Sequence, residues 1–80
     1  MTEISRNPED YRPTTHAGQQ AKHRDIDWQH VAETIREGDI KNSHKENCVL
    51  FVKEFISKDK PVGVVANVED GAIITVEYRY

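Results

Sequence analysis

The chain has few of the residues that stabilise small folds covalently or place proteins in membranes. Its 80 residues include one cysteine, Cys48, so no disulfide can form within the chain. Because Cys48 begins an apolar β-rich run, we expect it to be a small buried residue and not a nucleophile. No run is long and apolar enough for a membrane span or a signal peptide, which favours a cytoplasmic protein without a membrane partner.

Excess positive charge is also lacking. Eleven basic residues stand against 14 acidic ones, which gives a formal net charge of −3. Bulk charge therefore does not favour nonspecific nucleic-acid binding, and any RNA contact has to use a local patch. Metal-ligand spacings and phosphate-binding glycine motifs are missing as well, so the sequence predicts no metal site and no cofactor.

What the chain does have changes in character near residue 47. All four histidines and the runs with helical spacing precede that point, and three β-rich runs follow it. Residues 1–14 hold two prolines and no periodicity, which predicts a flexible tail or loose strap. Residues 15–80 are expected to form a single α+β domain.

Two helices are predicted in the first half. Thr15 is the expected N-cap of a helix that runs from His16 to about Arg24. Asp27 is the expected N-cap of the second, and Gly38 is expected to end it in a left-handed conformation. The apolar face of this second helix is predicted to consist of Trp28, Val31, Ala32 and Ile35.

Three strands are predicted to follow as an antiparallel meander, over residues 48–56, 61–68 and 72–80. Residues 39–47 have the composition of a loop, and Asp70 and Gly71 favour a tight turn before the last strand. Strict alternation in that last strand directs Ile74, Val76 and Tyr78 inward. The residues predicted on its other face are Ile73, Thr75, Glu77 and Arg79.

Four short strings then resemble a known family. They are Thr15-His16-Ala17, Arg24-Asp25-Ile26, the helix ending with Val31, Ile35 and Gly38, and Ile73-Ile74-Thr75-Val76. Over about residues 14–79 they are similar to the DUF4258 family of small bacterial and archaeal proteins. The resemblance implies the RelE-like fold of the Barnase-EndoU-colicin-RelE superfamily. Two N-terminal helices would then pack on one face of a three- to four-stranded antiparallel sheet, with RNA-cleaving residues on the other face.

The resemblance also nominates residues. It makes His16, Arg24 and Thr75 the functional candidates. This chain has Gln20 where such proteins often carry an arginine, and Asp25 where they often carry a glycine. The lost arginine would have been a phosphate-binding charge.

The chemistry of metal-independent RNA cleavage can be assigned to these side chains. It needs a base for the 2′-hydroxyl, an acid for the leaving oxygen and a cation on the phosphate. His16 can act as acid or base, Glu77 is a second possible base, and Arg24 or Arg79 can bind the phosphate while Thr75 donates a hydrogen bond. The candidate RNA-binding residues are Arg79, His23 and Gln20.

Two classes of function stay open. One is a RelE-like toxin, a metal-independent ribonuclease acting on free or ribosome-bound RNA, with an antitoxin protein as its partner. The other is a noncatalytic protein-interaction module that binds a partner or a second copy through the sheet face or an exposed edge strand. The His16, Arg24 and Thr75 set favours the enzyme, whereas the negative charge and Gln20 favour the module. In a purely structural reading, His16 is a helix-start histidine bonded to a backbone carbonyl.

Overall fold

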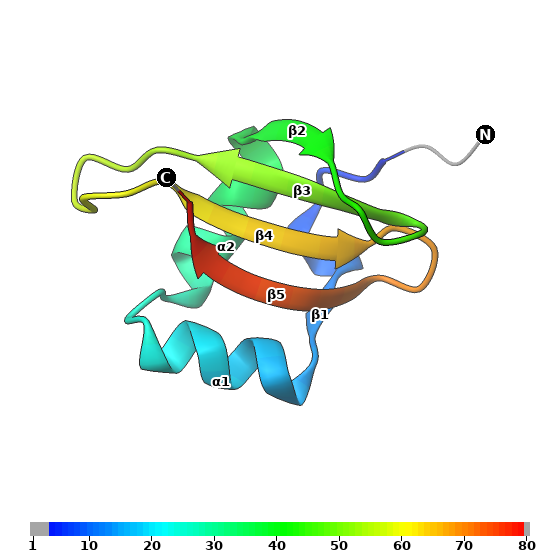
Figure 1. The fold of residues 1–80 in the computed structure, drawn as a ribbon, viewed down its shortest axis with the longest axis horizontal. Helices are drawn as coiled ribbons and strands as arrows, with labels where there is room; N and C mark the ends of the chain where they lie inside the picture. Colours follow the sequence, from blue (N-terminus) through cyan, green and yellow to red (C-terminus); the bar gives the residue numbers. More distant parts are fainter. Residues whose placement is uncertain (1–3, 80) are drawn as a thin grey trace.

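The computed structural model describes residues 4–79 and shows an α+β fold (Figure 1). Residues 1–3 of the predicted tail, and Tyr80 at the end of the last predicted strand, lie outside the described residues. In chain order the elements are η1 (Pro8–Asp10), β1 (Arg12–Pro13), α1 (Thr15–His23), α2 (Trp28–Glu37), β2 (Asp39–Asn42), β3 (Cys48–Lys53), β4 (Val62–Asn67) and β5 (Ala72–Tyr78). Neither helix of residues 4–79 has the length and apolar character that crossing a membrane requires.

The sheet has five strands in the order β1-β5-β4-β3-β2. Its centre is the predicted meander, since β3 pairs antiparallel with β4, and β4 with β5. The prediction of a three- to four-stranded antiparallel sheet is wrong in two respects. β2 adds a strand antiparallel to β3, and β1 adds one parallel to β5, so the sheet is mixed and a strand precedes the helices.

Within the predicted tail, residues 8–14 contribute η1, β1 and the N-cap of α1. Tyr11 is buried in the core, where its ring meets the edge of Phe51, and its hydroxyl donates to the Ser5 carbonyl oxygen at 2.8 Å. Burial raises the pKa of this hydroxyl, and the negative charge of Asp10 raises it further. One buried ring and a two-residue strand leave no periodic pattern in the sequence, so neither was predicted.

Helix α1 starts one residue earlier than predicted. Thr14, and not Thr15, is the N-cap, and its hydroxyl oxygen accepts from the Ala17 amide at 3.2 Å. The helix ends at a left-handed residue, Asp25, whose φ is 56°. The Ile26 amide then donates back to the Ala21 carbonyl at 2.8 Å, which completes a Schellman ending. Glycine adopts this left-handed conformation at the least steric cost.

Helix α2 begins after Asp27, as predicted, and His30 Nδ1 accepts from the Asp27 amide at 3.3 Å. Val31 and Ile35 are buried, also as predicted. Trp28 is not, because 47% of its surface is exposed. It is the first residue of α2, and it lines an apolar crevice of about 360 Å³ together with Ala17, Val31 and Ile73.

Gly38 ends α2 for a different reason from the one predicted. Its φ is −71°, so it is not left-handed. A Cβ at this position would overlap the Thr34 carbonyl oxygen and lie 2.9 Å from the Val52 carbonyl oxygen. Glycine therefore lets the end of α2 pass directly against β3, and β2 begins at the next residue.

Both helices contribute to one core. In Figure 1, α2 lies behind the sheet and α1 lies along its β5 edge. Phe51, Val64 and Val76 point into this core from neighbouring strands. A register shift between Val65 and Ala66 turns Ile73 inward as well, so its predicted place on the other face is wrong. The cause is local, because a β-bulge interrupts the period-2 alternation on which the prediction relied.

Candidate functional site

Four of the predicted site residues lie together on α1. His16, Gln20, His23 and Arg24 line one shallow depression of about 390 Å³, together with Gln19. His16 and His23 are exposed, while Gln20 and Arg24 are partly buried. Ala17, which precedes Gln20 by three residues and therefore lies near it on the helix surface, is fully buried against the sheet. The predicted polar stripe therefore lies at the border between the exposed side of α1 and the side that packs against β5.

Two of these residues also close one edge of the sheet. Gln20 Oε1 accepts from the backbone amide of Val76 in β5 at 3.1 Å. One turn later, the carbonyl oxygen of Arg24 accepts from the Tyr78 hydroxyl at 2.7 Å. Since β1 pairs only with the start of β5, α1 lies along the remainder of that strand, where Gln20 satisfies the Val76 amide. Gln20 thus has a structural role that sequence reasoning missed.

Thr75, Glu77 and Arg79 lie on another surface, the open face of the sheet, which we define as the face away from the helices. Arg79 Nη1 pairs with Glu77 Oε1 at 3.2 Å. The aliphatic part of Arg79 crosses Gly63, where a Cβ would lie only 2.6 Å from Arg79 Cγ. The Glu77 carboxylate, two residues earlier in the chain, consequently holds the Arg79 guanidinium over the sheet.

The residues nominated for catalysis are thus not gathered in one pocket. Thr75 does not line the depression on α1 that contains His16 and Arg24. Those two are themselves eight residues apart on the helix, which corresponds to about 12 Å along its axis. Cleavage at a phosphate requires an acid, a base and a cation around the same group. The geometry places Thr75 and Glu77 on a different surface from His16 and Arg24.

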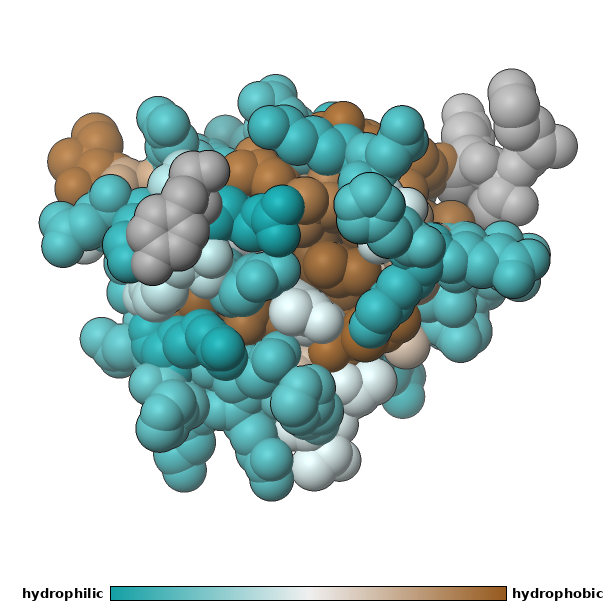
Figure 2. All heavy atoms as spheres, in the orientation of Figure 1, coloured by the Kyte–Doolittle hydropathy of each residue, from teal (hydrophilic) through white to brown (hydrophobic). Residues whose placement is uncertain are grey.

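The open face carries a second hollow, of about 680 Å³, near β2. Leu50 and Val52 form its apolar floor, and Figure 2 shows apolar surface in the middle of this face with hydrophilic side chains around it. The charged residues that line it balance, since three are cations and three are carboxylates. They are Lys41, Lys53, Arg79, Glu37, Asp39 and Glu54. Such a balanced rim gives an RNA backbone little net attraction.

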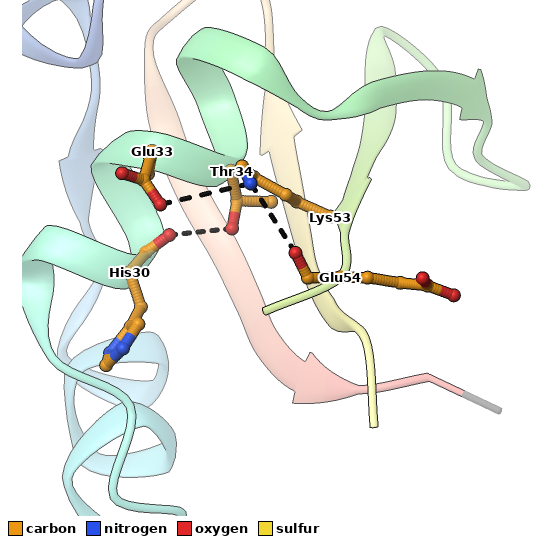
Figure 3. A network of polar contacts seen from close by, with 5 residues as sticks. All are labelled: His30, Glu33, Thr34, Lys53 and Glu54. Carbon is orange, nitrogen blue, oxygen red and sulfur yellow. Dashed lines mark hydrogen bonds and ion pairs between the residues drawn. The ribbon is translucent and has the colours of Figure 1, made fainter. Parts of the chain in front are cut away.

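The position of β2 at the edge of this hollow is fixed from the core side. Lys53 at the end of β3 reaches Glu33 of α2 at 4.0 Å and the Glu54 carbonyl at 3.4 Å (Figure 3). Thr34 is fully buried, and its hydroxyl donates to the His30 carbonyl at 2.6 Å. The Arg6 guanidinium donates to the carbonyl oxygen of Gly38 at 2.8 Å. These contacts hold the end of α2, and β2 starts at the next residue.

Strand β2 is the other edge of the sheet, and it differs from the α1 side. All four of its residues are exposed, and among residues 4–79 no strand pairs with its outer side. In an antiparallel pair, alternate residues turn their N–H and C=O groups away from the partner strand. Two of the four therefore present unpaired backbone groups outward. Sequence reasoning missed β2 because a strand exposed on both faces has no apolar alternation.

Comparison with known proteins adds no assignment, since no protein-family model, curated protein or solved structure significantly matches the chain. Within residues 4–79, no group of three or more His, Cys, Asp or Glu side chains is placed to hold a metal ion.

Proposed function

We propose that this domain is a noncatalytic protein-interaction module that binds an extended segment along the outer edge of β2. The observation that carries the proposal is the contrast between the two edges of the sheet. On one edge α1 supplies Gln20 to the Val76 amide, whereas β2 has no such cover among residues 4–79. An exposed edge pairs readily with another strand through main-chain hydrogen bonds.

The surroundings of β2 support this choice. Ile40, which faces the same side as Phe51, is 38% exposed. Asp39 and Lys41 border the hollow on the open face. An added strand would therefore meet an apolar side chain on one face and two opposite charges on the other, which supplies specificity beyond the backbone pairing.

The test uses photo-crosslinking in cells that express the protein. A photoreactive amino acid replaces Asn42 in β2 or, as a matched control, the equally exposed Gln19 in α1. We expect protein adducts from position 42. Ile40→Lys should reduce them, because an added charge on an edge strand blocks pairing. Ile56→Lys should not, since Ile56 is fully exposed in the loop after β3. Adducts from position 19 alone would contradict the proposal.

A second candidate is the RelE-like ribonuclease that the family resemblance implies, with an antitoxin as its protein partner. The specific observation in its favour is the depression on α1 that His16, His23 and Arg24 share. It requires growth arrest on expression and RNA cleavage without added metal. His16→Ala should then lower the rate about 100-fold or more, as loss of a general acid or base does. His44→Ala in the exposed loop before β3 is the control.

The two candidates separate cleanly in that assay. A wild-type protein that cleaves neither free nor ribosome-bound RNA excludes the ribonuclease. If Glu77→Gln abolishes cleavage while His16→Ala does not, the base lies on the open face. Crosslinks to RNA from position 19 would support the α1 depression as its binding surface.

A further inference from the structure

We infer that the segment bound along β2 is the β2 strand of a second copy of this chain, paired antiparallel about a two-fold axis at Ile40. This inference rests on the proposed function and names its partner. It follows from the charges and the apolar residue that β2 itself presents.

The order of residues in β2 makes the strand complementary to itself. In an antiparallel pair centred on Ile40, Asp39 of one copy lies opposite Lys41 of the other, and the second Lys41 lies opposite the second Asp39. Two cross-strand pairs of opposite charge form at once. Neither side chain forms an ion pair with another residue of the described chain, so both remain available.

The same register aligns the apolar surface. Ile40 of one copy lies opposite Ile40 of the other, on the face that carries Phe51. The 38% of Ile40 that is exposed in the single chain would then be covered by its own counterpart. Shifting the register by one residue to centre on Lys41 would oppose Lys41 with Lys41, and like charges directly opposite are destabilising.

The rest of the fold permits this pairing and restricts it to β2. The two five-stranded sheets would join into one continuous sheet, with the α1-covered edges at its two ends. Those ends are less open to pairing, because α1 lies along β5 there and Gln20 already accepts from the Val76 amide. A closed dimer follows, and not a growing filament. Because β2 has only four residues, we expect a weak and concentration-dependent dimer.

The experiment combines charge reversal with sedimentation of the full chain over a concentration series. Asp39→Lys and Lys41→Asp each place two pairs of like charges opposite one another across the dimer. Each should raise the dimer dissociation constant about tenfold or more. A mixture of the two variants restores both opposite pairs, and so does the double variant. Both should dimerise about as well as the wild type. Asp59→Lys, an exposed carboxylate in the loop between β3 and β4, is the matched control.

Disulfide trapping then measures the register. Ile40→Cys places two thiols opposite each other, within the Cα separation that a disulfide allows. Asn42→Cys places them about 13 Å apart along the strands, out of range. Fast oxidation of the Ile40 variant, compared with the Asn42 variant and with wild-type Cys48, supports the inference. Preferential linking of the Asn42 variant overturns it.

The outcomes distinguish this inference from the proposed function. A wild type that stays monomeric, or a dimer that charge reversal leaves intact, overturns the self-pairing. If the photoreactive group at position 42 still links to another protein, and Ile40→Lys prevents it, the interaction module stands without the homodimer. If position 42 yields no protein adduct and the chain is monomeric, both proposals fail.

Discussion

Gly38 allows the close contact between α2 and β3 to be tested with a single methyl group. In Gly38→Ala the new Cβ would overlap the Thr34 carbonyl oxygen and lie 2.9 Å from that of Val52. Both atoms belong to the backbone, so neither can rotate away as a side chain would. The backbone angles at Gly38, φ −71° and ψ 164°, are open to any residue, which means that the effect comes from the contact alone.

The cost can be worked from these contacts. Overpacking of one carbon against rigid neighbours costs about 1 to 3 kcal/mol, and two backbone clashes place this site toward the upper end. The hydrogen bond from the Gly38 amide to the Thr34 oxygen, 2.9 Å long, would be strained as well. Alanine returns about 0.4 to 1 kcal/mol by restricting the unfolded chain. We expect a net loss of about 1 to 3 kcal/mol, against about 4 to 12 kcal/mol for a domain of this size.

Urea denaturation measures this loss, with Gly18→Ala as the matched control. Gly18 lies inside α1, and a Cβ there would meet no atom within 4 Å. The same substitution should therefore stabilise the protein there, by about 0.5 to 1 kcal/mol, through helix propensity. The urea midpoint should fall in Gly38→Ala and rise in Gly18→Ala, while the dependence of the unfolding free energy on urea concentration stays unchanged. A Gly38→Ala protein as stable as the wild type would refute the contact.

Three further predictions concern stability. Ile35→Ala should cost about 2 to 5 kcal/mol in denaturant unfolding, because Ile35 is fully buried between α2 and the sheet, and a loss below about 1 kcal/mol would place α2 elsewhere. Asp25→Gly should leave the protein as stable or up to about 1 kcal/mol more stable, because φ is 56° there, and a clear destabilisation would contradict the left-handed ending of α1. The folded-state pKa of Tyr11 is raised, so the unfolded chain releases that proton first, and the stability that Tyr11 contributes should be lost as pH rises from about 10 through the folded pKa. Tyr11→Phe should flatten this fall in a pH series of melting temperatures, and an equal fall in both proteins would assign it to other groups.

Part of the candidate site could be predicted from the sequence, and part depended on the tertiary structure. Sequence spacing was enough to place His16, Gln20 and His23 on one helical stripe, because those residues are neighbours on a helix. Whether Thr75 reaches that stripe depends on which face of β5 it occupies and on how α1 lies beside the strand. No local pattern contains that information. The second purpose of Gln20, which is to accept from the Val76 amide, depends on a partner 56 positions away.

Local chemistry in the sequence determined the elements that short-range interactions stabilise. Asp27 begins α2, Val31 and Ile35 repeat at helical spacing, and Gly71 adopts the positive φ that the turn before β5 requires. Each of these signals acts within a few residues, so it survives without knowledge of the fold.

Only the tertiary structure decided the edges of the sheet. β1 forms because Arg12 and Pro13 pair with the start of β5. β2 forms because its four exposed residues pair with the side of β3 that β4 leaves open. Backbone pairing of this kind requires no apolar side chain and leaves no period in the sequence. Likewise, the sequence predicts only that Gly38 ends a helix, whereas its close contact with β3 is a property of the tertiary structure. The outer edge of β2, the proposed binding surface, is therefore defined by contacts between distant segments of the chain.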